Sequence, residues 1–456
     1  MDFLNLLNKV DSFIWGPPLL ILLVGTGIYF TVRLGLIQIV RLPKALKLIF
    51  KAKNNGSGDI SSFGALCTAL AATIGTGNIV GVATAIKAGG PGALFWMWLA
   101  AFFGMATKYS EGLLAIKFRT KDDNNQVSGG PMYYIVNGMG EKWKPLAVFF
   151  SISGILVALL GIGTFSQVNS ITDAVQGSFN IDPKITGVIL AICVALVVFG
   201  GLQSISNVST KLVPFMTVVY ILMCLMVLGK YYTLIPDTLK LIFKSAFTGQ
   251  AATGGFIGAT VSMAIRNGIA RGVFSNESGL GSAPIAAAAA KTKWPAEQGL
   301  ISMTGTFIDS IIICTLTGIS LIISGVWQSD LNGAIMTQSA FASVFPNVGP
   351  IFLTVSLSLF AFTTIIGWSY YGERCFEFLF GVKKINLFRI LFVTMVLLGG
   401  FLKLEIVWVI ADIVNALMAL PNLIALLALS PIVISETKLY LDYIDVKNKL
   451  DDEKII

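Results

Sequence analysis

The sequence Ala-Ala-Thr-Ile-Gly-Thr-Gly-Asn-Ile-Val-Gly occupies residues 71–81, inside an uncharged run that extends from 60 to 86. A second apolar segment carries a similar interruption, Ala-Ile-Arg-Asn-Gly-Ile-Ala-Arg-Gly-Val, at residues 264–273. Glycine and polar residues inside such runs are typical of membrane helices that are broken near the bilayer midplane, where small ligands bind. Because the segments lie in different halves of the chain, they predict two broken helices around one site.

The composition is that of a membrane protein. Of the 456 residues, 55% are hydrophobic and only 12% are charged, and the mean hydropathy is +0.81. A soluble domain carries about twice that charged fraction, and about 20 apolar residues cross a bilayer. Uncharged runs near or above that length predict an all-α integral membrane protein; they are 12–32, 60–86, 145–172, 185–210, 212–229 and 331–372.

The residue inventory excludes several other classes of function. The five cysteines are isolated and form no CxxC pair, and the chain has no histidine, so neither a metal centre nor a disulfide framework is predicted. The first apolar run follows Asp2 and Asp11 and lacks a basic leader, which favours a retained helix over a signal peptide. No HExxH, GxGD or histidine-based triad indicates an enzyme.

The loop charges predict the orientation of the chain. We expect eleven membrane helices, at about 14–33, 60–87, 92–117, 145–176, 184–200, 209–229, 254–276, 298–326, 350–376, 386–402 and 404–435. With the N-terminus outside and the C-terminus inside, the inner loops carry 21 Lys and Arg and the outer loops 7, as the positive-inside rule requires. The net charge of +8 therefore reflects topology and does not indicate a nucleic-acid partner. A twelfth crossing would place the basic tail outside, so we expect one helix at 404–435, kinked near Pro421.

An offset of 191 residues aligns Gly77 with Gly268 and Gly81 with Gly272. The predicted topology runs these two segments in opposite directions, which indicates a five-plus-five inverted repeat. The units are an N-terminal helix with a basic interfacial segment (1–59), the first repeat (60–229), the second repeat (254–435) and a cytoplasmic tail (436–456). The alternative is that both GxxxG patterns only pack helices together. Polar groups at membrane depth, such as Asn267, favour the broken-helix interpretation.

The motif Gly-Gly-Pro-Gly-Ala-Leu-Phe-Trp-Met-Trp-Leu at 89–99, followed by Gly104, resembles the signature of the sodium:alanine symporters, the alanine-or-glycine:cation symporter family. Residues 73–81 and 266–281 are also similar to that family. The resemblance implies a LeuT-type fold in the cytoplasmic membrane, Na⁺ as a co-transported ion and not a cofactor, and a small neutral amino acid as substrate, with alanine and glycine hard to separate. A monomer is expected.

A broken helix offers two kinds of backbone group. The amides of Thr76, Gly77 and Asn78 begin the second half of the first broken helix, and their partial positive charge suits a carboxylate. Gly75 and Gly77 permit close approach of a ligand. We expect Gln167 to contact the substrate ammonium and Phe165 and Trp368 to form apolar walls, although ordinary packing also explains both aromatics. The full predicted substrate set adds Thr73, Ile265, Asn267 and Gly268.

The carbonyls from Ala71 to Ile74 end the first half-helix and are hard oxygen ligands suited to Na⁺. The resemblance to the LeuT-type fold implies that Thr363 and Thr364 complete a sodium site with carbonyls of Ala71, Ile74 and Phe360. The alternative is that each threonine hydroxyl only bonds back to its own helix.

Asp309 lies deep in an apolar segment, and two roles remain open for it. Buried acids mark ion or proton paths, and Asp309 could equally pair with Arg266 or Arg271. The buried acids also support a second hypothesis, a proton-coupled transporter of the same shape, which would follow a pH gradient without Na⁺. Other acids near helix ends are predicted to be structural: Glu111, Asp173, Glu277, Glu373 and Asp412.

Overall fold

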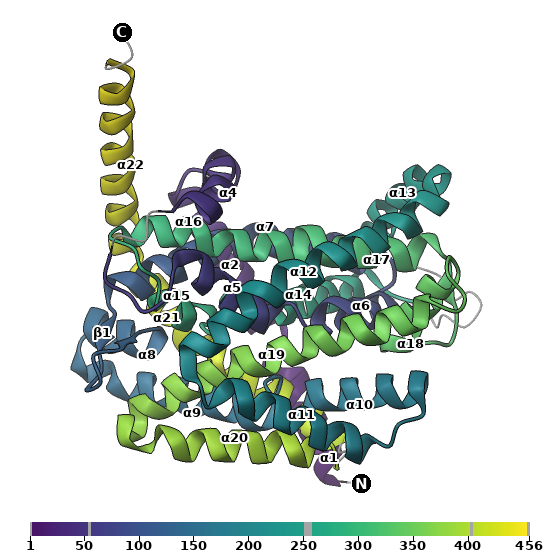
Figure 1. Ribbon diagram of the computed structural model, residues 1–456. Helices are drawn as coiled ribbons and strands as arrows, with labels where there is room; N and C mark the ends of the chain where they lie inside the picture. Colours follow the sequence, from purple (N-terminus) through teal and green to yellow (C-terminus); the bar gives the residue numbers. More distant parts are fainter. Residues whose placement is uncertain (1, 53–55, 250–257, 402–404, 454–456) are drawn as a thin grey trace.

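The computed structural model describes residues 2–52, 56–249, 258–401 and 405–453. Within these residues the chain is mostly helical, and long helices cross one another in a layered bundle (Figure 1). One two-stranded antiparallel hairpin, β1 (Thr120–Lys121) with β2 (Val127–Ser128), lies at one end of that bundle. The predicted all-α class is therefore confirmed.

The N-terminal part contains the predicted first helix and one that the sequence analysis missed. The helix expected at 14–33 is α2, which begins at two prolines suited to a first helical turn and packs so closely on α7 that a Cβ on Gly27 would lie 2.8 Å from the Phe103 carbonyl. A further helix precedes α2, and two short helices follow it. The bounds are α1 (Asp2–Ile14), α2 (Pro17–Arg33), α3 (Ile37–Val40) and α4 (Leu42–Lys51).

The next part of the chain supplies the first broken helix and the long helix α7. The Ser61 side chain caps the start of α5 by accepting a hydrogen bond from the Gly64 amide at 2.9 Å, which satisfies one of the free amides of the first turn. The elements are α5 (Ser62–Thr73), η1 (Gly77–Gly81), α6 (Val82–Gly89), α7 (Gly92–Lys117), α8 (Pro131–Tyr134), η2 (Ile135–Met139), η3 (Glu141–Trp143), α9 (Lys144–Leu160), α10 (Phe165–Phe179), α11 (Pro183–Val198), α12 (Gly201–Lys230), η4 (Tyr232–Leu234) and α13 (Ile235–Phe247).

The remaining part begins at the second glycine-rich segment; residues 254–257 of its predicted first helix lie outside the described residues. The elements are α14 (Val261–Asn276), α15 (Ala283–Ala288), α16 (Pro295–Thr306), η5 (Phe307–Cys314), α17 (Thr315–Ile323), η6 (Val326–Gln328), α18 (Gly333–Ala342), α19 (Gly349–Phe380), η7 (Val382–Lys384), α20 (Ile385–Gly399), α21 (Glu405–Ala428) and α22 (Ser430–Glu453).

By length and composition, five helical stretches of the described chain can cross a membrane, and the number rises to seven when two bent pairs are each taken as one span. The first bent pair joins α5 to η1 and α6 at 52°, and the second joins α21 to α22 at 60°. The structure thus supports a multi-pass membrane protein, and the count of eleven helices remains a prediction.

The expected kink near Pro421 is displaced. Pro421 lies inside α21, and the 60° bend follows at Leu429, between Ala428 and Ser430. The region predicted as one helix at 404–435 is therefore two helices, and α22 continues through the predicted tail to Glu453. It projects away from the bundle in Figure 1.

Arg119 joins two segments that are far apart in the sequence. Its guanidinium donates to the carbonyls of Ala288 and Ala290 at 2.8 and 2.7 Å, and to those of Ser57 and Thr292 at 2.5 and 3.1 Å. The segment before α5 thereby runs beside the chain that follows α15, as the parallel bridge between Ile60 and Ala290 also indicates. This contact fixes the ends of α5 and α15 relative to each other.

Candidate substrate and sodium site

The first broken helix lies where the sequence predicts it. α5 ends at Thr73, Ile74–Thr76 form the break, and η1 begins at Gly77. A Cβ on Gly75 would lie 2.3 Å from the Thr364 hydroxyl oxygen, and a Cβ on Gly77 would lie 3.1 Å from the Ser275 Cα. Both glycines are therefore needed because α19 approaches the break closely at Gly75 and α14 at Gly77.

Two amide side chains hold the polar backbone of the break. The Asn78 Oδ1 accepts a hydrogen bond from the Gly75 amide at 2.9 Å, and the Gln167 Oε1 accepts one from the Thr76 amide at 3.4 Å. Both side chains are fully buried. The Gln167 Nε2 is also buried, and no described group accepts its hydrogens. A buried donor without an acceptor is costly, so this nitrogen marks a place where a ligand acceptor fits.

Gln167 reaches the break because of a second interruption, which the sequence analysis missed. The helix expected at 145–176 is two helices, α9 and α10, separated by Gly161–Thr164. A Cβ on Gly163 would lie 2.7 Å from the Ala158 carbonyl oxygen and 2.9 Å from the Trp368 Cβ, so the close approach of α19 requires glycine there. α10 then starts with Phe165, which is buried beside Gln167 in its first turn.

Four of the five residues predicted for sodium are linked by hydrogen bonds of the two threonines. The Thr364 hydroxyl lies 3.4 Å from the Ile74 carbonyl oxygen and 3.1 Å from that of Phe360. The Thr363 hydroxyl donates to the same Phe360 carbonyl at 2.9 Å. Both threonines thus bond back to their own helix, as the alternative interpretation expected, and Thr364 also reaches the break. Ala71 lies in the last turn of α5, three residues before Ile74.

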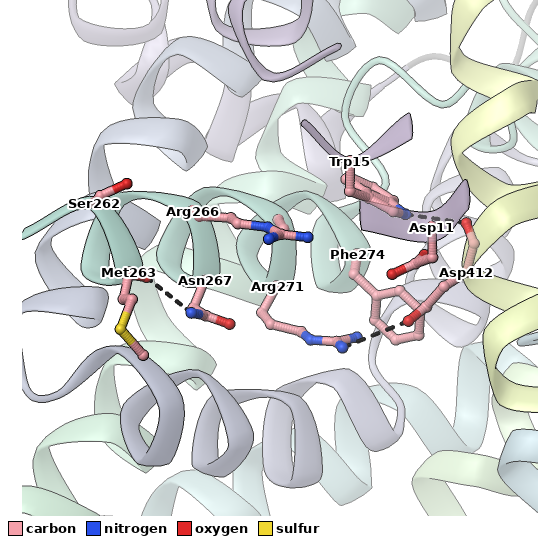
Figure 2. Close-up of a pocket in the computed structure, with 10 residues that line it drawn as sticks. Asp11, Trp15, Ser262, Met263, Arg266, Asn267, Arg271, Phe274 and Asp412 are labelled. Carbon is pink, nitrogen blue, oxygen red and sulfur yellow. Dashed lines mark hydrogen bonds and ion pairs between the residues drawn. The ribbon is translucent and has the colours of Figure 1, made fainter. Parts of the chain in front are cut away.

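The second broken helix is displaced from the predicted position, and the prediction of a break at Asn267–Gly268 is wrong. α14 continues through both residues. Asn267 donates to the Met263 carbonyl one turn earlier at 2.9 Å (Figure 2). A Cβ on Gly268 would lie 2.3 Å from the Ala93 carbonyl oxygen, so this glycine allows α14 to pack against α7. Ile265 lies in the same uninterrupted helix.

The actual break follows α14, at Glu277–Ser282, in the sequence Glu-Ser-Gly-Leu-Gly-Ser. Three of its residues have positive φ: Glu277 (56°), Gly279 (86°) and Gly281 (82°). A sequence signal did exist, because Gly279-Leu-Gly281 matches Gly75-Thr-Gly77 at an offset of 204 residues (279 minus 75). The offset of 191 instead aligned Gly77 with a packing glycine.

Buried charged side chains from α7 hold this second break, and the sequence analysis overlooked the basic one. Lys108 donates to the Asn276 carbonyl at 2.9 Å, at the end of α14. The Glu111 Oε1 accepts from the amides of Gly279 and Gly281, both at 3.1 Å. From α21, the Asn422 Nδ2 donates to the same Glu111 oxygen at 2.7 Å. The prediction that Glu111 is structural fits these contacts.

A hydrogen bond joins the side chains of Glu277 and Trp368. The Trp368 indole N–H donates to the Glu277 Oε1 at 2.9 Å, and the Ser282 hydroxyl donates to the other oxygen of that carboxylate. Both side chains are fully buried. The orientation of the Trp368 ring therefore depends on the second break as well as on packing within α19.

Asp309 connects the two breaks. Its carboxylate is fully buried in η5 and accepts from the Asn78 Nδ2 at 2.7 Å and from the Ser275 hydroxyl at 3.0 Å. The expectation of a partner in Arg266 or Arg271 is wrong, since Arg271 lies 3.5 Å from Asp412 instead. Asn78 belongs to the first broken helix and Ser275 to the second, so one carboxylate contacts both.

Of the other predicted substrate residues, Thr73 ends α5, and its hydroxyl bonds back to the Ala69 carbonyl at 3.2 Å. The structure therefore brings together the residues of the first break, Gln167 and Thr364. Trp368 lies one turn after Thr364 on α19, and Phe165 lies two residues before Gln167 on α10. It does not bring Asn267 or Gly268 into contact with them.

Comparisons with known proteins identify relatives along the whole chain. A sequence profile of the sodium:alanine symporter family matches residues 1–454. The "Sodium/alanine symporter AgcS" of Methanococcus maripaludis is 53% identical, over 96% of this chain and 98% of that protein. An "Uncharacterized transporter" of Haemophilus influenzae is 55% identical over the full length of both chains.

The fold is also found among solved structures. The crystal structure of MhsT in complex with L-phenylalanine superposes with a TM-score of 0.55 and 13% sequence identity, covering 84% of this chain and 99% of that one. At that identity the likeness shows a LeuT-type fold and no more. The sequence matches cover almost the whole length, and they show that the chain belongs to the sodium:alanine symporter family.

Proposed function

We propose that this protein carries alanine, and glycine with it, across the cytoplasmic membrane together with Na⁺ by alternating access. The observation that carries the proposal is the first break, where backbone amides, the unpartnered Gln167 Nε2 and the Thr364 hydroxyl meet in one buried place. Family membership supports Na⁺-coupled amino-acid transport in general; the choice of substrate and the mechanism are our proposal.

The contacts of Gln167 change the role that we assign to it. Its Oε1 already accepts from the Thr76 amide, so the group left for a ligand is the Nε2 donor. A donor cannot accept a hydrogen bond from an ammonium group, but it suits a carboxylate. The Thr76 amide already donates to Gln167, and the Asn78 amide already donates to the Gly75 carbonyl at 3.3 Å. We therefore propose that the substrate carboxylate binds between the Gln167 Nε2 and the Gly77 amide. Phe165 and Trp368, both buried, would limit the size of the side chain.

We propose that Na⁺ binds beside the substrate, between the end of α5 and α19. Its ligands would be the carbonyls of Ala71, Ile74 and Phe360 and the hydroxyls of Thr363 and Thr364. Carbonyl and hydroxyl oxygens are hard ligands suited to such a cation. Since Thr364 also contacts the break at Ile74, Na⁺ at this place would hold α5 and α19 together.

The proposed topology completes this description. The N-terminus lies outside and the C-terminus inside, and residues 60–229 and 254–435 form two inverted repeats in a monomer. The two glycine-containing breaks, at Gly75 and at Gly279, support this arrangement, as does the contact of Asp309 with both broken helices.

A proton-coupled transporter is the second candidate, because Glu111, Glu277 and Asp309 are fully buried acids in the same region. Uptake of labelled alanine by proteoliposomes, under a Na⁺ gradient or a pH gradient alone, separates the two candidates. We expect uptake only with Na⁺, and competition by unlabelled glycine. Uptake that follows the pH gradient without Na⁺ would support proton coupling.

A pair of glycine variants tests the site itself. Gly77→Leu places a side chain where a Cβ alone lies 3.1 Å from Ser275, so we expect uptake to be lost. Gly177→Leu is the matched control, because an added Cβ at Gly177 on α10 meets nothing within 4 Å. Normal uptake by Gly77→Leu protein would refute the proposed site.

A further inference from the structure

A polar cavity lies between α1, α14 and α21 (Figure 2). Its volume is about 310 Å³, far above the roughly 10–15 Å³ that one water needs on the same measure. In the proposed topology, the cavity lies on the outer side of the membrane. The lining residues are Asp11, Trp15, Ser262, Met263, Arg266, Asn267, Ala270, Arg271, Phe274 and Asp412.

The cavity contains two charges of each sign, and they are not equally paired. Arg271 lies 3.5 Å from Asp412, and the Trp15 indole donates to the Asp412 carbonyl at 3.1 Å (Figure 2). These contacts tie α14, α21 and the residue after α1 together. They leave Arg266 and Asp11, which line the same cavity, outside that ion pair.

The side chains of Arg266 and Asp11 are not held by hydrogen bonds or ion pairs to other described residues. The Asp11 Oδ1 is buried and has no hydrogen-bond partner. Arg266 makes no hydrogen bond or ion pair with any residue that the structure describes, and its side chain is exposed to the cavity. Asp11 and Arg266 attract each other across the cavity without an ion-pair contact, so a small molecule that carries both charges is complementary to the pair.

The position of the cavity connects it with the proposed transport site. Phe274 forms part of its wall, and the Arg271 guanidinium lies 5.5 Å from the centre of that ring. The next residue, Ser275, contacts Gly77 and donates to Asp309. The cavity wall at Phe274 is thus one residue along α14 from Ser275, which lies against the first break.

We propose that this cavity is a second binding site for a small zwitterionic amino acid, which is held there before it reaches the break. Arg266 binds the carboxylate and Asp11 the ammonium group. The inference rests on the proposed function, because it takes the same substrate, but it adds a site that the transport reaction does not itself require.

Binding stoichiometry of the full chain in lipid nanodiscs tests the proposal. With labelled alanine in Na⁺, we expect two sites per chain, the weaker of which disappears in Arg266→Gln and in Asp11→Asn. Gly77→Leu should keep only the weaker site, and the double variant Gly77→Leu with Arg266→Gln should bind no alanine. Propylamine and propionate, which each lack one of the charges, should fail to compete for the weaker site in wild-type protein.

The exposed pair on α13 supplies matched controls. Lys240→Gln and Asp237→Asn make the same charge changes at side chains that are 79% and 74% exposed, and they should keep both sites. A single site in the wild-type protein would overturn the proposal. So would a second site that survives both Arg266→Gln and Asp11→Asn, or a change in transport rate with no change in stoichiometry. Na⁺-driven uptake by the wild-type protein is measured in parallel; its loss would instead overturn the proposed function.

Discussion

Thr364 offers the sharpest test of the proposed sodium site. Its hydroxyl is almost fully buried and lies between two carbonyl oxygens, 3.4 Å from Ile74 and 3.1 Å from Phe360. Thr364→Val replaces only the hydroxyl with a methyl group and keeps the β-branched shape, so it removes the polar atom at nearly the same side-chain volume. The variant therefore separates the role of the hydroxyl in ion binding from its role in helix packing.

The expected size of the effect follows from the contacts. Losing a neutral hydrogen bond costs roughly 0.5–1.5 kcal/mol, and losing one to a charged group roughly 1.5–3 kcal/mol. If the Na⁺–hydroxyl contact is treated as the second kind, and 1.4 kcal/mol is tenfold, the half-saturating Na⁺ concentration rises about 10- to 150-fold.

The assay is the initial rate of alanine uptake by proteoliposomes as a function of Na⁺ concentration, with alanine at saturation. Thr394→Val is the matched control, because the exposed Thr394 hydroxyl also bonds back one turn, to Ile390 at 2.8 Å, but is on α20. It should leave the Na⁺ dependence unchanged. If Thr364→Val has the same Na⁺ dependence as Thr394→Val, the hydroxyl is only a packing group and the proposed ligand set is wrong.

Three further predictions concern the site and its support. Gln167→Glu replaces the free donor with a carboxylate. The loss of a hydrogen bond to the charged substrate costs roughly 1.5–3 kcal/mol of binding free energy, so the KM for alanine should rise by about tenfold or more. Gln176→Glu, on the exposed side of α10, should leave uptake kinetics unchanged. Gly163→Ala brings a Cβ to 2.9 Å from Trp368 and should lower stability in denaturant by about 1–3 kcal/mol; an effect no larger than that of Gly177→Ala would contradict this packing argument. Arg119→Lys loses the planar fork that reaches four carbonyls and should destabilise by roughly 1.5–3 kcal/mol in the same assay; unchanged stability would show that the link between the two segments contributes little.

The first break was predictable because its cause is local. Gly75 and Gly77 weaken the helix within three residues, and Asn78 returns its own side chain to the Gly75 amide. No distant residue is needed to recognise the pattern. The threonine pair is conspicuous as two adjacent hydroxyls in an uncharged helix, but its predicted role in sodium binding came from the resemblance to the LeuT-type fold.

The second break was not predictable to the same degree because its support comes from far away. The amides of Gly279 and Gly281 bond to Glu111, and the Gly279 carbonyl accepts from Asn422, which is 143 residues away. Gly268 looked equivalent in sequence, but only the approach of α7 shows that it is a packing glycine. The interruption between α9 and α10 was missed partly for the same reason, since Gly163 is required by the Trp368 side chain on α19 as well as by the nearby Ala158 backbone.

The hydrogen bonds from Gly75 to Asn78 and from Thr76 to Gln167 have a consequence for how small a ligand the protein can capture. The chain's own side chains hold these amides in place, so the break does not have to order when substrate arrives. Even the best small ligands gain at most about 1.5 kcal/mol per non-hydrogen atom, and alanine and glycine have very few atoms. A binding site that first had to fold around such a ligand would consume most of that free energy. A break that is rigid beforehand leaves it for affinity, which makes molecules near the lower size limit of recognition usable as cargo.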